Sequence, residues 1–280
     1  MRGLFDGLFD DAALFPPGDA PMAAAVPAHR ELRKRLGSLV GPFVVPAGRL
    51  DELVDHLDAG DEPFDVSLIA AAADLPDAAN RVGGDPRLAL SAVEVPVVAS
   101  AAAAIDTLSV LDDVLPAGVP AALEIPRSDT GDEVLGVLAG TPYRAKLRTG
   151  GLRADLFPSP AELAASLHAS VRRGIPVKCT AGLHRAVRHT DPLTGLDHHG
   201  FLNVLLAADA LASGSPPNVA ADWLHKTDAD AIATSVRTWS ADRAGRARAA
   251  FTSFGTCSVL EPVEDLVALR LLPSAEQTVA

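Results

Sequence analysis

The sequence is poor in aromatic residues, in cysteine and in net positive charge. Phe, Trp and Tyr make up 4% of its 280 residues against 48% hydrophobic residues in all, so Ala, Leu and Val must fill most of the core. Two cysteines, Cys179 and Cys257, are too few for a disulfide framework and predict a reducing, cytoplasmic environment. The formal net charge of −12 argues against nucleic acid or an anionic membrane as the main partner, because both select a basic face.

Long apolar runs and common cofactor motifs are also missing. The most apolar window, residues 95–105, has about 11 residues, whereas a transmembrane helix needs roughly 20. Residues 1–21 carry four acidic side chains, unlike the basic start of a secretory signal. There is no G-x-G-x-x-G, P-loop, H-E-x-x-H or C-x-x-C pattern. We therefore expect a soluble, cytoplasmic protein with no nucleotide cofactor, no metal and no membrane partner.

Short Val-rich runs alternate with longer amphipathic segments, which is typical of βαβ units around a parallel sheet. The predicted strands are 8–15, 42–47, 65–71, 89–97, 120–126, 142–149, 175–181 and 250–258. Eight strands and a chain of this length predict a single (β/α)8 barrel domain, a TIM barrel, over residues 1–280. An open, doubly wound sheet is the competing architecture.

One connection is much longer than the others. Residues 182–249 contain a His-rich polar stretch, an apolar helical segment at 201–212 and further helical sequence. An insertion after the seventh strand would lie at the C-terminal face of the barrel, where such enzymes place their active sites. The apolar segment is also a candidate interface, so we expect a homo-oligomer.

The choice of basic residue points to the chemistry. The chain has 20 arginines and only four lysines, yet two of those lysines fall in predicted strands. Because side chains alternate along a strand, Arg144, Lys146 and Arg148 share one face, and Lys178 shares a face with Thr180. Their neighbours on the other face are small or apolar, which predicts that the lysines point into the barrel.

Acidic residues on neighbouring strands are predicted to point the same way. Glu94 lies between Val93 and Val95, and Glu124 lies between two aliphatic residues. Buried charges are costly unless they are paired, so these groups form either a structural ion network or an active site. Lysine, unlike arginine, can lose its proton near neutral pH and act as a nucleophile.

Three stretches, "AKLRTGG" (145–151), "VKCTAGL" (177–183) and "FGTCS" (254–258), resemble the class I deoxyribose-phosphate aldolases. These enzymes are (β/α)8 barrels with a Schiff-base lysine on strand six, a second lysine on strand seven and a phosphate-binding stretch on strand eight. The resemblance is partial: Arg148 stands where the family has a small hydroxyl residue, and Glu94 would replace an aspartate. An uncharacterised barrel family that uses the same two-lysine arrangement is the other interpretation.

The residues and the resemblance together predict a metal-independent lyase of the aldolase type that needs no cofactor. Lys146 would form the Schiff base with a small anionic carbonyl metabolite, with Lys178 as the alternative nucleophile. The predicted catalytic residues are Lys146, Lys178, Glu94 and Glu124, and the predicted substrate-binding residues are Arg148, Gly150, Gly151, Thr180, Gly182, His184, Gly255, Thr256 and Ser258. The same cluster would also suit a non-covalent decarboxylase, isomerase or phosphoribosyltransferase, or a metabolite-binding protein.

Four histidines occur within 16 residues, at His184, His189, His198 and His199. Their irregular spacing does not predict a metal site. His184, just after the seventh strand, is a candidate proton shuttle or substrate contact. The remaining histidines are expected on the solvated surface.

Overall fold

The structure, a computed structural model, describes residues 2–128 and 130–273. Within these ranges, eight parallel strands close into a barrel in the order β1-β2-β3-β4-β5-β6-β7-β10. The strands are β1 (Phe9–Asp11), β2 (Val40–Pro46), β3 (Phe64–Ile69), β4 (Leu88–Val95), β5 (Ala121–Glu124), β6 (Arg144–Arg148), β7 (Val177–Thr180) and β10 (Phe251–Thr256). Each apolar run predicted as a strand supplies one of them. The (β/α)8 barrel is therefore confirmed, and the open sheet is wrong.

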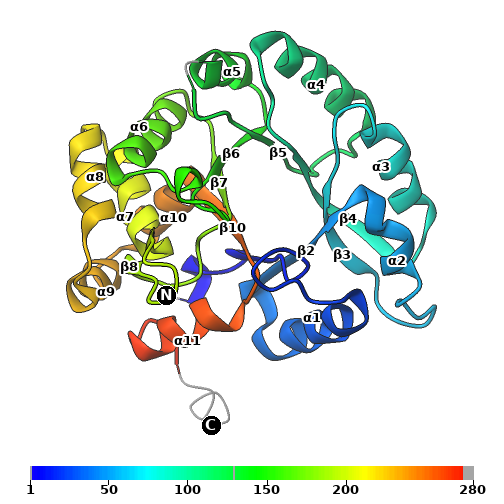
Figure 1. Ribbon diagram of the computed structural model, residues 1–280, viewed down its shortest axis with the longest axis horizontal. Helices are drawn as coiled ribbons and strands as arrows, with labels where there is room; N and C mark the ends of the chain where they lie inside the picture. The colour runs from blue at the N-terminus through cyan, green and yellow to red at the C-terminus, as the bar shows by residue number, and fades with distance from the viewer. Residues whose placement is uncertain (1, 129, 274–280) are drawn as a thin grey trace.

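Helices form a ring outside the strands (Figure 1). Those that follow β1 to β6 and β10 are α1 (Met22–Leu36), α2 (Leu50–Val54), α3 (Leu75–Gly84), α4 (Ala101–Val114), α5 (Thr130–Leu138), α6 (Pro160–Val171) and α11 (Leu260–Ala268). At the start of α6, Ser159 and Glu162 form a capping box, in which each side chain accepts a hydrogen bond from the other's backbone N–H.

Two predicted elements are shorter in the structure. The first strand ends at Asp11 rather than residue 15, because the Asp11 carboxylate accepts a hydrogen bond from the Ala13 N–H and the chain turns there. The second is the segment 47–60, whose apolar residues have helical spacing and predict one helix; it forms only a single turn of 3-10 helix (Ala47–Arg49) followed by α2. Both differences lie at element ends, where local hydrogen bonds compete with the hydrophobic pattern.

The long connection after β7 forms a short hairpin and four helices. These are β8 (His189–Thr190), β9 (Asp197–His198), α7 (Phe201–Ala212), α8 (Pro217–His225), α9 (Ala229–Arg237) and α10 (Ala241–Ala250). Every residue of α7 from Phe201 to Leu211 is buried, because α6, α8 and α10 pack around it. The prediction that this apolar helix offers an interface is therefore wrong: its apolar surface is covered by the chain itself.

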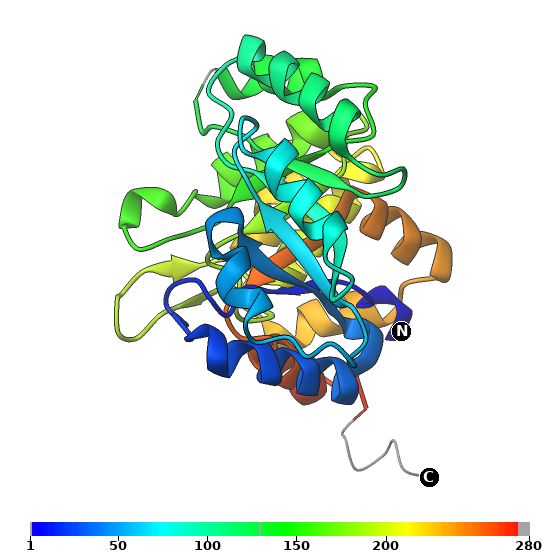
Figure 2. The same ribbon diagram turned by 90° about the vertical axis from the view of Figure 1, so that its right-hand side faces the viewer.

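Two connections protrude from the same side of the molecule (Figure 2). One is the loop after β6, which contains a 3-10 turn (Ala154–Leu156), and the other is the β8–β9 hairpin. Their tips carry Leu152 and Leu193, which are 74% and 93% exposed. None of the helices in the described ranges combines the length and the hydropathy that crossing a bilayer requires.

Candidate active site in the barrel

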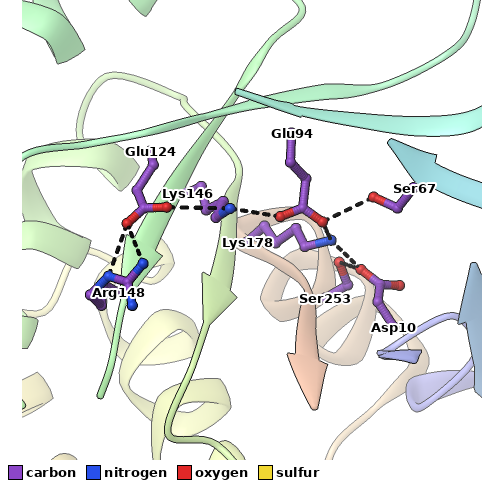
Figure 3. Close-up of polar contacts among 8 residues, drawn as sticks. All are labelled: Asp10, Ser67, Glu94, Glu124, Lys146, Arg148, Lys178 and Ser253. Atoms are coloured by element: carbon purple, nitrogen blue, oxygen red, sulfur yellow. Dashed lines mark hydrogen bonds and ion pairs between the residues drawn. The ribbon is translucent and has the colours of Figure 1, made fainter. Parts of the chain in front are cut away.

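A network of ion pairs crosses the interior of the barrel (Figure 3). Alternation along β6 turns Lys146 inward, as predicted, while Ala145 and Leu147 pack outward. The Lys146 Nζ atom lies 2.8 Å from Glu94 Oε2 and 3.3 Å from Glu124 Oε2. All three side chains are no more than 5% exposed, so the charges are paired where water cannot screen them.

The second lysine extends the network towards the first strand. The Lys178 Nζ atom lies 2.5 Å from Asp10 Oδ2 and 2.6 Å from Glu94 Oε1. Although Lys146 and Lys178 are register partners on adjacent strands, the Glu94 carboxylate bridges their ammonium groups. The repulsion between the two ammonium groups is therefore compensated, because both form an ion pair with the same carboxylate.

Three further groups complete the network. The Arg148 guanidinium donates from Nε and Nη2 to Glu124 Oε1, each at 2.9 Å. Ser67 donates to Glu94 Oε1 and Ser253 donates to Asp10 Oδ2, each at 2.9 Å. Arg148 is about a third exposed, at 33%, and is therefore the part of the network that solvent reaches most easily.

The electrostatics of the network follow from this pairing. Burial alone would raise the pKa of Glu94, but the ammonium groups of Lys146 and Lys178 outweigh burial and hold that pKa well below its ordinary value. Burial alone would lower the pKa of Lys178, but Asp10 and Glu94 raise it above its ordinary value. Burial raises the pKa of Asp10, and Lys178 offsets part of that rise. Glu94 is thus ionised and Lys178 is protonated at neutral pH.

The network separates two cavities. An upper cavity of about 1410 Å³ opens at the C-terminal ends of the strands, and Glu94, Glu124, Lys146 and Arg148 form part of its lining. A lower cavity of about 320 Å³ lies towards their N-terminal ends, and Lys178 faces it. Glu94 borders both cavities. The position of the upper cavity is the one at which (β/α)8 enzymes carry out their chemistry.

The predicted binding residues divide into two groups. Those that line the upper cavity are Arg148, Gly151, Thr180, Gly182, His184 and Gly255. Gly150, Thr256 and Ser258 do not line it. Gly150 packs where a Cβ atom would come 2.8 Å from the Gly182 Cα atom, and the Thr256 hydroxyl donates to the Ser258 carbonyl oxygen. These residues shape the barrel ends from outside the cavity.

Three members of the network were missed from the sequence. They are Asp10, Ser67 and Ser253. For Asp10 the deciding observation is structural: Phe9 packs edge-on against Phe201 and Phe254 outside the barrel, so the next residue faces inward. Ser67 and Ser253 carry no comparable signal, since a small hydroxyl suits either face of a strand.

Histidines gather beside the mouth of the upper cavity. The rings of His189 and His198 lie 5.3 Å apart and those of His184 and His198 lie 6.5 Å apart. Among the described residues, no group of three or more His, Cys, Asp or Glu side chains has an arrangement that could hold a metal ion. Burial lowers the pKa of His184 to about 4, so its ring is neutral at physiological pH.

The prediction that the other histidines are solvated is wrong for two of them. His29 is 2% exposed, and its Nδ1 atom lies 2.9 Å from the Asp11 carboxylate. His199 is fully buried, and its Nε2 atom donates to the Pro158 carbonyl oxygen at 2.7 Å. Both rings are held by polar partners, which permits their burial.

The fold and the site define a (β/α)8 barrel with a buried, lysine-containing ion network beneath a large cavity. No family model matches the chain, and neither do any curated proteins or solved structures. The likeness to deoxyribose-phosphate aldolases therefore rests on three short stretches and on the shared barrel fold.

Proposed function

We propose that the protein is a class I lyase of the aldolase type, in which Lys146 forms a Schiff base with a small anionic carbonyl compound. The observation that carries this proposal is the position of the Lys146 amine. It is buried in the floor of a cavity of about 1410 Å³, within reach of two carboxylates that can exchange protons with it.

The geometry favours Lys146 over Lys178 as the nucleophile. Lys178 faces the lower cavity and is held between Asp10 and Glu94 at 2.5 and 2.6 Å, which raises its pKa. Lys146 borders the upper cavity, and both of its carboxylate partners are shared with other cations. A shared carboxylate holds each of its cations less firmly than it would hold one alone.

The proposed reaction begins with transfer of one proton from the Lys146 ammonium to Glu124. The free amine adds to the substrate carbonyl carbon. The carbonyl oxygen then takes one proton from the amine nitrogen and one back from Glu124, and leaves as water. In the resulting iminium, the Glu124 carboxylate removes the proton of the β-hydroxyl group. The C–C bond breaks, the former hydroxyl carbon leaves as the first carbonyl product, and the electron pair of the bond passes into an enamine. Protonation of the enamine and hydrolysis then release the second product and restore Lys146. The reverse sequence forms the bond.

The substrate's anionic group would bind to Arg148. This guanidinium borders the cavity and is a third exposed, and Glu124 is its one ion-pair partner among the described residues. Its remaining N–H groups can therefore receive a carboxylate or a phosphate in the forked geometry that arginine provides. Gly151 and Gly182 line the same cavity.

A non-covalent enzyme is the second candidate. Two ion pairs, with Glu94 and Glu124, would also suit a Lys146 that stays protonated throughout the reaction. Such a fixed positive charge can stabilise an anionic transition state without a covalent bond to the substrate. Decarboxylation or isomerisation of an anionic metabolite would use it in this way.

Borohydride trapping tests the covalent proposal. The protein is incubated with a panel of phosphorylated and carboxylated aldehydes and ketones, reduced, and mapped by peptide mass spectrometry. We expect an adduct on Lys146 that Lys146→Gln lacks and that a variant at the exposed Lys34, Lys34→Gln, keeps. No adduct on Lys146 across the panel would exclude the Schiff base. Once a substrate is found, the activity of Lys146→Arg decides between the candidates. If Lys146 acts only as a fixed positive charge, arginine should keep part of the activity. If Lys146 acts as an amine nucleophile, the activity should be lost.

A further inference from the structure

Two arginines line the lower cavity, and neither forms an ion pair with a carboxylate of the ion network. It lies at the N-terminal ends of the strands, below the Asp10–Lys178–Glu94 part of the network. Arg144, at the start of β6, and Arg248, near the end of α10, both line it. Arg144 and Lys146 share a face of β6, so one strand presents a cation to each level of the barrel interior.

Neither guanidinium has an ion-pair partner in the part of the chain that the structure describes. Among the described residues, no hydrogen bond or ion pair reaches the Arg144 side chain. Arg248 donates to the carbonyl oxygens of Phe251 and Asp6, at 3.1 and 3.0 Å, and these carry no net charge. The nearby Asp10 carboxylate already accepts from Lys178 and Ser253.

The two arginines also act on each other. Burial lowers the pKa of Arg248 to about 10. The charges of Asp10 and Asp6 oppose this effect, and the neighbouring charge of Arg144 adds to it. Burial likewise lowers the pKa of Arg144, with Asp10 opposing. Two half-buried like charges that border one cavity are costly unless an anion lies between them.

We propose that the lower cavity is a binding site for a small oxyanion, which Arg144 and Arg248 hold between their guanidinium groups. Paired arginines match the oxygen geometry of phosphate and of carboxylate. A volume of about 320 Å³ suits an inorganic ion or a short metabolite. The site is distinct from the upper cavity, because the ion network lies between them, and it does not depend on a Schiff-base reaction.

Titration calorimetry with inorganic phosphate tests the site, in a low-salt buffer free of other oxyanions, with succinate as a second probe. Phosphate binding alone would assign an inorganic or phosphorylated ligand, and succinate binding alone would assign a dicarboxylate. We expect Arg144→Gln to weaken the binding of the preferred probe about tenfold or more, because one charge-assisted pair of hydrogen bonds is lost. The matched control is Arg246→Gln, which removes an exposed arginine from the same helix as Arg248.

A second readout uses stability. Without any oxyanion, Arg144→Gln should unfold at a higher temperature than the wild type, because it relieves the repulsion from Arg248. Arg148→Gln distinguishes binding in the two cavities, since Arg148 is the arginine of the ion network and lines the upper cavity. The proposal is overturned if neither probe binds, if Arg144→Gln binds as tightly as the wild type, or if Arg246→Gln or Arg148→Gln loses binding to the same degree as Arg144→Gln.

Discussion

The Lys178 ammonium lies 2.5 Å from the Asp10 carboxylate, although 168 residues separate them in the sequence. The contact exists because β1 and β7 both pair with β10, so that three parallel strands bring the two side chains to the same level inside the barrel. Glu94 completes the arrangement from the opposite wall by accepting from both Lys146 and Lys178. It is therefore the residue on which both lysines depend.

Replacement of Glu94 by glutamine should destabilise the protein strongly. The change leaves two buried ammonium groups with one carboxylate fewer, and breaking a buried ion pair from one side costs about 3–5 kcal/mol. Urea unfolding of Glu94→Gln measures the loss, and Glu264→Gln, at an exposed site on α11, is the control. A loss below about 1 kcal/mol would mean that the network is open to water.

Burial of His199 should make stability depend on pH. Burial lowers its folded-state pKa to about 4 from an ordinary 6.5, so the unfolded chain takes up the proton first as the pH falls. The contribution is complete above pH 6.5 and is lost between pH 6.5 and 4, by up to about 3 kcal/mol. The cause is visible in the structure, since the His199 Nδ1 atom is buried without a hydrogen-bond partner among the described residues.

Unfolding in urea at pH 7.5 and at pH 5 measures this dependence. The His199→Gln variant should lose less stability between the two pH values than the wild type does. The exposed histidine at position 56 provides the control, and His56→Gln should keep the wild-type difference. Equal losses in all three proteins would show that His199 does not titrate in this range.

Much of the fold and part of the network could be predicted from the sequence. The lysines, Glu94 and Glu124 stand in apolar strands where period-two alternation fixes their direction, and that local rule is reliable. Asp10 was missed because its strand has three residues and two adjacent aspartates, so alternation does not say which one faces inward without the position of Phe9. The lower cavity could not be predicted, because one of its two arginines, Arg248, lies on a helix. The contact of that helix residue with the barrel interior is long-range and leaves no local pattern in the sequence.

Two glycines should respond in opposite ways to alanine. At Gly150 the new Cβ atom would come 2.8 Å from the Gly182 Cα atom and from the Phe157 ring, so the ends of β6 and β7 must move apart. We expect a loss of about 1–3 kcal/mol. Gly136 lies within α5, with no atom near its added Cβ, and Gly136→Ala should gain about 0.5–1 kcal/mol. Thermal unfolding compares the two, and equal effects would contradict this packing.

Lys178 should act as a positioning residue for the proposed nucleophile. While Lys178 is present, Glu94 divides its charge between two ammonium groups. Without Lys178, Glu94 pairs with Lys146 alone, and the ion pair between Glu94 and Lys146 becomes stronger. The stronger pair should hinder loss of the proton that Lys146 must release before it attacks a carbonyl. Borohydride trapping on Lys146 should then require a higher pH in Lys178→Gln than in the wild type.

The double variant Asp10→Asn/Lys178→Gln repeats the test in a protein whose folding does not suffer from an unpaired Asp10 carboxylate. It removes one charge of each sign from a pair in direct contact, so the network keeps its balance while Glu94 still loses one of its two lysines. We expect its trapping yield, measured against pH, to move in the same direction as that of Lys178→Gln. A purely structural role for Lys178 would lower the trapping yield at every pH and leave the shape of the curve unchanged, and an unchanged curve in the folded double variant would contradict the positioning role.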